Sequence, residues 1–142
     1  MRSDSSQSLY VVPRGLGEGF RASIRSHILE LADPYSGDAL APTPDDLFVT
    51  SLASQLAWST RALLRARGLP DDAHVVATWR TRSELSGPDE IDLTVTLSNI
   101  SDSARDELAS TPLFEEGPAV WPRSRAHVHI SVVTGRPSAV SR

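Results

Sequence analysis

The 142-residue sequence contains no cysteine, and this absence excludes several kinds of chemistry at once. Without a thiol the chain cannot form a disulfide, a cysteine–metal centre or the thiolate of a thiol peroxidase. Lysine is absent as well, because all 14 basic residues are arginine. Schiff-base lysines and the lysine of a phosphate-binding P-loop are therefore excluded. Proton transfer would have to use the four histidines, the carboxylates or the two tyrosines, since arginine is a poor general base.

Long hydrophobic runs and an excess of positive charge are also lacking. The longest uncharged run is too short and too polar to span a membrane, and a net charge of −4 disfavours binding to a phosphate backbone. The first residues, MRSDSSQS, contain no apolar signal core. We therefore expect a cytoplasmic protein with neither nucleic-acid nor membrane partners. We also expect residues 1–8 and 135–142 to be flexible.

Residues 43–68 predict one long, enclosed helix. Thr43 and Asp46 have the spacing of a capping box, Pro44 suits the first helical position, and Gly68 suits the position after the last turn. No charged residue occurs between positions 47 and 60. The helix therefore lacks a polar surface face and should be covered on most sides, which a chain of this size achieves most readily by forming a dimer.

The remaining segments predict an α+β domain that spans residues 1–142 as a single unit. One strand is expected near residues 9–12. A longer one over 20–31 should place Phe20, Ala22, Ile24 and Ile28 on one face. Strands are also expected at 74–82, 90–97 and 126–133, and a short helix at 101–110 that Pro112 terminates.

Two segments carry a resemblance to a known family. The first runs from residues 37–40 through APTPDDL into the long helix, and the second is WPRSRA at 121–126. Together they resemble the signatures of the OsmC and organic hydroperoxide resistance family, over about residues 20–133. The resemblance implies an antiparallel sheet packed on a long central helix and a shorter second helix, in an intertwined homodimer.

The same resemblance assigns family positions to four residues. Gln55 occupies the position of the cysteine that attacks peroxides, and Trp121 that of the second, resolving cysteine, so the chain resembles a divergent member that lacks both. Asp45 matches a family glutamate in charge, and Arg14 is a better match than Arg21 for a family arginine. The resemblance thus implies a former peroxidase pocket lined by Gln55, Trp121, Asp45 and Arg14, with no catalytic residue among them.

The histidines and tryptophans do not form a recognisable motif. His127 and His129 point to the same face of a predicted strand, but two histidines leave a zinc site without its third protein ligand. We therefore predict no metal and no cofactor. The three tryptophans, including Trp58, are interpreted as core or interface residues.

Three hypotheses for function follow. The leading one is a homodimer without thiol peroxidase activity, related to oxidative-stress proteins, which either binds a small, partly apolar ligand or serves as an interaction module. The alternative is an enzyme of another class, possibly hydrolytic, that uses Asp45, an arginine and a histidine. The third, peroxide reduction, would need a thiol from elsewhere. A cavity lined by Gln55 and Asp45 favours the binder or the enzyme, whereas a pocket filled by Trp121 favours the interaction module.

Overall fold

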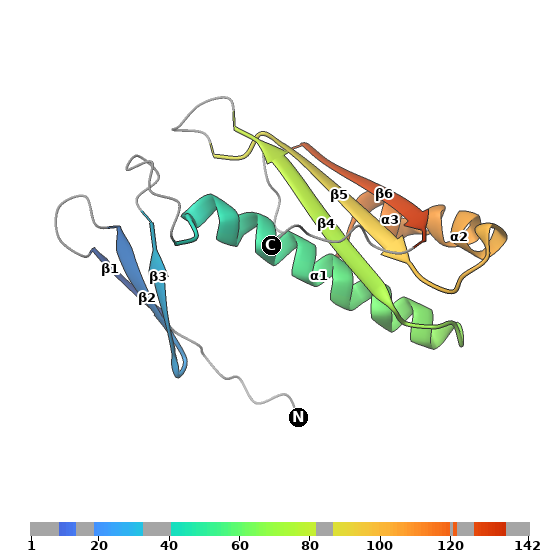
Figure 1. The fold of residues 1–142 in the computed structure, drawn as a ribbon, viewed down its shortest axis with the longest axis horizontal. Coiled ribbons are helices and arrows are strands. Elements are labelled where there is room, and N and C mark those ends of the chain that lie inside the picture. The colour runs from blue at the N-terminus through green and yellow to red at the C-terminus, as the bar shows by residue number, and fades with distance from the viewer. Residues whose placement is uncertain are drawn as a thin grey trace. The chain divides into compact units, whose positions relative to one another are not determined.

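A computed structural model describes residues 9–13, 19–32, 41–81, 87–119, 121 and 127–135. The segment 1–8, and all of 135–142 except Gly135, for which flexibility was predicted, lie outside this range. The chain divides into two compact units, Met1–Leu47 and Phe48–Arg142, whose elements are drawn in Figure 1. Helices and strands are both present, so the predicted α+β class is confirmed. That residues 1–142 act as one domain stays a prediction.

The first unit contains a three-stranded antiparallel sheet in the order β1-β2-β3. Its strands are β1 (Leu9–Pro13), β2 (Phe20–Ile24) and β3 (His27–Leu31). The prediction of one strand over residues 20–31 is therefore wrong. Arg25 and Ser26 form a two-residue turn, in which Arg25 adopts a φ of 54°, a conformation that few residues other than glycine adopt. Because this pair contains neither the asparagine nor the glycine that two-residue hairpin turns favour, the sequence does not mark the turn.

The hairpin changes which side chains share a face. Ile24 pairs with His27 and Ser23 with Ile28, so Ile28 lies opposite the face of Phe20 and Ala22 and is 67% exposed. The face of Phe20 is nevertheless almost wholly apolar. Its members, by register, are Leu9, Val11, Pro13, Phe20, Ala22, Ile24, His27, Leu29 and Leu31.

Helix α1 (Pro44–Ala66) begins and ends as its sequence predicts. The backbone N–H of Thr43 donates to Asp46 Oδ2 (2.7 Å) and that of Asp46 donates to Thr43 Oγ1 (3.2 Å), which completes a capping box. At the other end Gly68 has a φ of 65°. The N–H of Leu69 donates to the carbonyl of Leu64 (2.9 Å), the Schellman arrangement that closes a helix.

An exposed ion-pair cluster follows the last turn of α1. Arg65 Nε lies 2.5 Å from Asp71 Oδ2, and Arg61 Nη2 lies 3.4 Å from the same oxygen. The hydrogen bond from Arg65 is the main cause that lowers the pKa of Asp71. Because the cluster is exposed, it contributes little to stability.

The second unit contains a sheet in the order β4-β5-β6. Strands β4 (Ala73–Arg80) and β5 (Glu90–Leu97) pair antiparallel, whereas β6 (His127–Thr134) pairs parallel to β5. The crossover between β5 and β6 contains α2 (Asp102–Ala109) and α3 (Pro112–Glu116). Pro112 therefore opens a further helical turn instead of only ending the previous helix, in agreement with the preference of proline for a first helical position.

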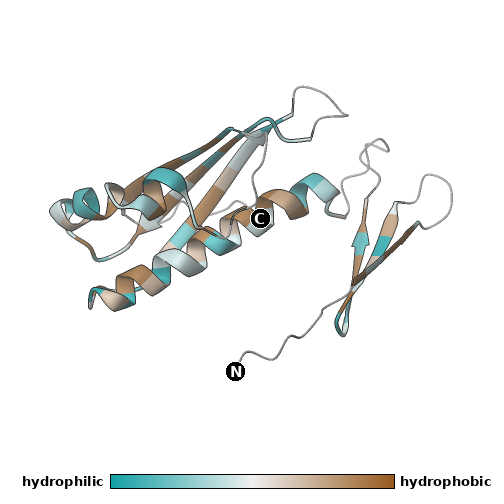
Figure 2. Ribbon diagram, turned by 180° about the vertical axis from the view of Figure 1, so that it is seen from behind, coloured by the Kyte–Doolittle hydropathy of each residue, from teal (hydrophilic) through white to brown (hydrophobic). Residues whose placement is uncertain are grey.

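One face of this sheet carries the core. The buried apolar positions of β5 alternate and so lie on one face, and they cluster with residues of all three helices, which therefore cover that face. Hydrophobic colour runs along these strands in Figure 2. The buried members are Val49, Leu52, Leu56, Leu64, Ile91, Leu93, Val95, Leu97, Leu108 and Phe114.

The surface of α1 that faces away from this core is uncharged over two turns but carries polar side chains, so the prediction that the helix lacks a polar surface face is wrong. Thr50, Ser51, Ser54 and Trp58 are exposed there, and Trp58 is 74% accessible. No helix in the described part of the chain combines the length and the hydrophobicity needed to cross a bilayer.

Candidate functional site

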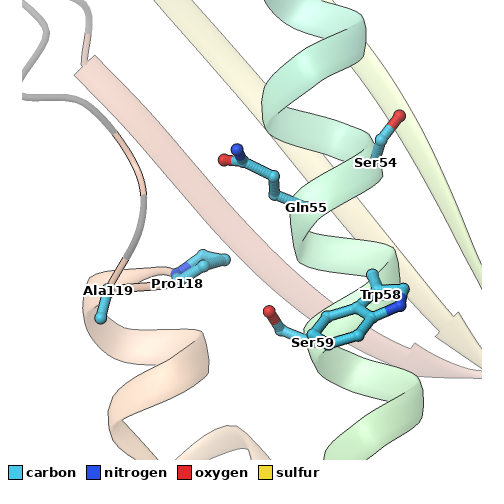
Figure 3. A pocket seen from close by; sticks show the side chains of 6 residues that line it. All are labelled: Ser54, Gln55, Trp58, Ser59, Pro118 and Ala119. Carbon is cyan, nitrogen blue, oxygen red and sulfur yellow. The ribbon is translucent and has the colours of Figure 1, made fainter. Parts of the chain in front are cut away.

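A pocket of about 420 Å³ opens on the second unit between α1 and the turn that follows α3. Figure 3 shows the side chains of Gln55 and Ser59 extending from α1 toward the segment that carries Pro118. The walls of the pocket are therefore one helix and one loop, which are far apart in the sequence. The lining residues are Ser54, Gln55, Trp58, Ser59, Pro118 and Ala119.

The first wall of the pocket is formed by side chains that the helical repeat of α1 brings to one side of the helix. Gln55 and Ser59 are four positions apart, which puts them one above the other on the helix. They lie beside the buried stripe that contains Leu52 and Leu56, and both are half-buried. Trp58 lies farther round the helix, where its indole borders the pocket from the exposed side.

A tight turn after α3 makes the second wall. The N–H of Gly117 donates to the carbonyl of Leu113 (3.0 Å), and the N–H of Trp121 donates to the carbonyl of Pro118 (3.0 Å). Gly117 has a φ of 84°, and a Cβ atom at this position would lie 2.3 Å from a carbon of the Trp121 ring. The indole therefore packs directly on the Gly117 backbone and against the core cluster. This packing holds Pro118 at the edge of the pocket.

Two buried polar atoms in this part of the fold have no hydrogen-bond partner in the described chain. They are Gln55 Oε1, an acceptor, and Trp121 Nε1, a donor. An unpaired buried group of this kind costs about 1–3 kcal/mol. None of the six lining residues has an ionisable side chain, so these walls carry no charge.

Known structures share this arrangement of elements. No protein-family model matches the sequence, and no sequence of a curated protein matches it. An organic hydroperoxide resistance protein OsmC from Legionella pneumophila is similar in structure with a TM-score of 0.67 at 14% identity, over 95% of this chain and 100% of that chain. An OsmC-like protein from Mycoplasma pneumoniae has a TM-score of 0.65 at 14% identity, over 94% and 99%. The protein OhrB of Bacillus subtilis has 0.64 at 13%, over 92% and 98%.

The chain has the OsmC-like fold. Its overall resemblance to this family, noted above from two short motifs, is thus confirmed at the level of structure. The absence of cysteine marks it as divergent within that fold. Identities of 13–14% show the fold alone, so the function must be argued from the site.

The structure describes three of the four predicted site residues. Gln55 lines the pocket, whereas Trp121 is not among the described lining residues and packs on Gly117 instead. Asp45 lies in the first turn of α1, ten positions before Gln55, and is outside the lining. Arg14 lies outside the described residues. That these four residues form one ligand site stays a prediction.

Several lining residues were not identified from the sequence. Trp58 and Ser59 lie three and four positions after Gln55, so the helical spacing alone could have found them. Trp58 was expected in the core or in an interface. It is exposed and therefore not part of the core, and a place in an interface stays a prediction. Pro118 has no sequence signal that relates it to α1.

The histidines of the last strand lie on the face of the β4–β6 sheet opposite the core. His127 pairs in register with Glu90, and His129 with Asp92. Both histidines are exposed. Within the described residues, no group of three or more histidines and carboxylates is arranged to hold a metal ion.

Proposed function

We propose that this protein is a homodimeric small-molecule-binding protein with the OsmC-like fold that works without thiol chemistry. The observation that carries the proposal is the open pocket of about 420 Å³ beside Gln55. Its volume lies within the roughly 300–1,000 Å³ that is typical of small-molecule sites. Trp121 is not among the described lining residues and so does not fill the pocket. The open pocket therefore supports the small-molecule binder over the interaction module.

The chemistry of the pocket walls disfavours an enzymatic role. Ser54 and Ser59 supply hydroxyl groups, but no histidine or carboxylate stands among the lining residues to activate them. Asp45, the acid proposed for a hydrolytic enzyme, is outside the lining as well. Reduction of a peroxide by a thiolate is excluded by the lack of cysteine.

A test of binding can use N-phenyl-1-naphthylamine, an uncharged apolar dye that fluoresces when it leaves water. We expect saturable binding of one dye per chain. The variant Ser59→Trp should abolish it, because an indole at this half-buried position fills the pocket. Ser103→Trp is the matched control, since Ser103 is exposed on α2 and does not line the pocket.

Fluorescence titration of the three proteins distinguishes the outcomes. Equal dye binding by Ser59→Trp and the unmodified protein would place the dye elsewhere. Absence of saturable binding in the unmodified protein would argue against a small-molecule site. Circular dichroism of each variant establishes that its fold is retained.

The homodimer is supported by apolar surface in each unit. The first unit exposes Leu9, Val11 and Phe20 on the apolar face of its sheet, and the second exposes Trp58 on the uncharged side of α1. Sheet faces and helices of this kind are stable when another layer covers them. A second copy of the chain supplies such a layer for both.

Sedimentation velocity should therefore show a dimer at low micromolar concentration. The Val11→Arg variant should shift the distribution toward monomer, because it places a charge on the apolar face of the first sheet. A Ser103→Arg variant on α2 should not. A folded monomer of the unmodified protein at that concentration would contradict the proposal.

A further inference from the structure

We propose that the pocket selects neutral ligands in which a carboxamide or hydroxyl group is attached to a flat apolar body, and that it rejects the corresponding carboxylates. This inference rests on the proposed binding function. It deepens that function by naming the chemical class of the ligand. Three features of the pocket support it: uncharged walls, the Gln55 amide and the Trp58 indole.

The uncharged walls disfavour an anion. Within the part of the chain that the structure describes, the six lining residues offer hydroxyl, amide, indole and aliphatic groups but no cation. A carboxylate that enters the pocket loses part of its hydration and gains no ion pair with these walls, which is unfavourable. A neutral carboxamide of the same shape avoids this cost.

The Gln55 amide sets the polar requirement. Its Oε1 atom is buried and has no donor in the described chain. Rotation of the terminal amide group exchanges its acceptor and donor ends. A ligand group that both donates and accepts can therefore pair with either end, and carboxamides and hydroxyls have this property. An ether or an ester accepts only.

The apolar surfaces set the shape of the rest of the ligand. The Trp58 indole and the Pro118 ring both line the pocket, and Figure 3 shows them on separate elements, α1 and the loop. Indole and proline rings offer flat apolar faces on which an aromatic ring packs well. A bicyclic aromatic body is within the capacity of about 420 Å³.

The test is a competition between two probes of equal shape. At pH 7, 2-naphthamide is neutral and 2-naphthoate is an anion. We expect 2-naphthamide to displace N-phenyl-1-naphthylamine at a concentration at least about tenfold lower than 2-naphthoate, a ratio that corresponds to about 1.4 kcal/mol. Equal or stronger displacement by 2-naphthoate would overturn the inference.

A variant tests the role assigned to Gln55. Gln55→Leu keeps a side chain of similar size and removes both hydrogen-bonding ends. The affinity for 2-naphthamide should fall by about five- to tenfold, in keeping with the loss of a net hydrogen bond. The affinity for naphthalene, which has no polar group, should stay the same or rise. An equal loss for both probes would show that Gln55 acts through packing and would overturn its assigned role.

Failure of the inference and failure of the proposed function give different results. If the dye binds but the amide and the carboxylate compete equally, the pocket exists and its selectivity for neutral ligands is wrong. If the dye does not bind the unmodified protein in a saturable way, the proposed function fails and no selectivity can be measured. Isothermal titration of the two naphthyl probes provides a second measurement that does not depend on the dye.

Discussion

Replacement of Gly117 with alanine is expected to lower the free energy of unfolding by about 2–6 kcal/mol. At the Gly117 φ of 84°, a Cβ atom would lie 2.3 and 2.4 Å from two ring carbons of Trp121. With a ψ of 173°, this backbone lies in a region that is essentially restricted to glycine, which costs another residue roughly 1–3 kcal/mol, and overpacking adds roughly 1–3 kcal/mol. Urea unfolding monitored by circular dichroism measures the sum.

Gly68→Ala is a control for a positive φ without a steric contact. Gly68 also has a positive φ, 65°, but a Cβ atom there would meet nothing within 4 Å. Its replacement should therefore cost only the conformational strain, about 1 kcal/mol. Equal losses for the two variants would contradict the close packing of Trp121 on Gly117.

Replacement of Trp121 with alanine is expected to destabilise the protein by about 2–3 kcal/mol. A fully buried aromatic residue loses about 3–5 kcal/mol on truncation. Trp121 should lose less, because it is half-buried and because the change also removes an unpaired indole N–H. A loss below about 1 kcal/mol would be typical of a surface residue and would contradict the packing described here.

Two further variants separate the contributions of Trp121. Trp121→Phe keeps an aromatic ring and removes the unpaired donor, so it should lose less than half as much stability as Trp121→Ala. In a Trp121→Ala background, Gly117→Ala should cost only roughly 1–3 kcal/mol, because the ring that it contacts is gone and only the backbone strain remains. Additive losses in this double-mutant cycle would show that the two residues do not touch.

The ends of α1 could be predicted from the sequence because they depend on neighbouring residues. Thr43 and Asp46 cap each other across one turn, and Gly68 supplies the positive φ after the last turn. Strand β5 was predicted with its observed bounds for a similar reason, since its alternation of apolar and polar residues is local. Local chemistry of this kind is visible in a single sequence.

The β2–β3 hairpin could not be predicted because its turn contradicts residue preferences. Arg25 adopts a positive φ without the glycine or asparagine that usually marks this conformation. Pairing of Ile24 with His27 then reverses the face of Ile28 relative to a continuous strand. The strand pairing, which stabilises the turn, is a non-local interaction.

The candidate site likewise has a part that local sequence predicts and a part that depends on non-local contacts. Position 55 was identified through the family resemblance, and its helical neighbours Trp58 and Ser59 follow from the repeat of an α-helix. Pro118 belongs to the site only because α3 ends at Gly117 and the chain turns back there. The packing of Trp121 on Gly117 could be recognised only from the backbone angles of that turn. These contacts depend on tertiary packing, for which one sequence gives no pattern.

The placement of Gln55 on α1 keeps the pocket chemistry separate from the stability of the helix. The buried stripe of α1 is formed by Val49, Leu52, Leu56, Thr60 and Leu64, and position 55 lies beside this stripe, at the pocket wall. A different side chain at position 55 alters what the pocket can bind without opening a cavity in the core. In evolutionary terms, a reactive group there can be lost and a hydrogen-bonding group gained while the scaffold continues to fold.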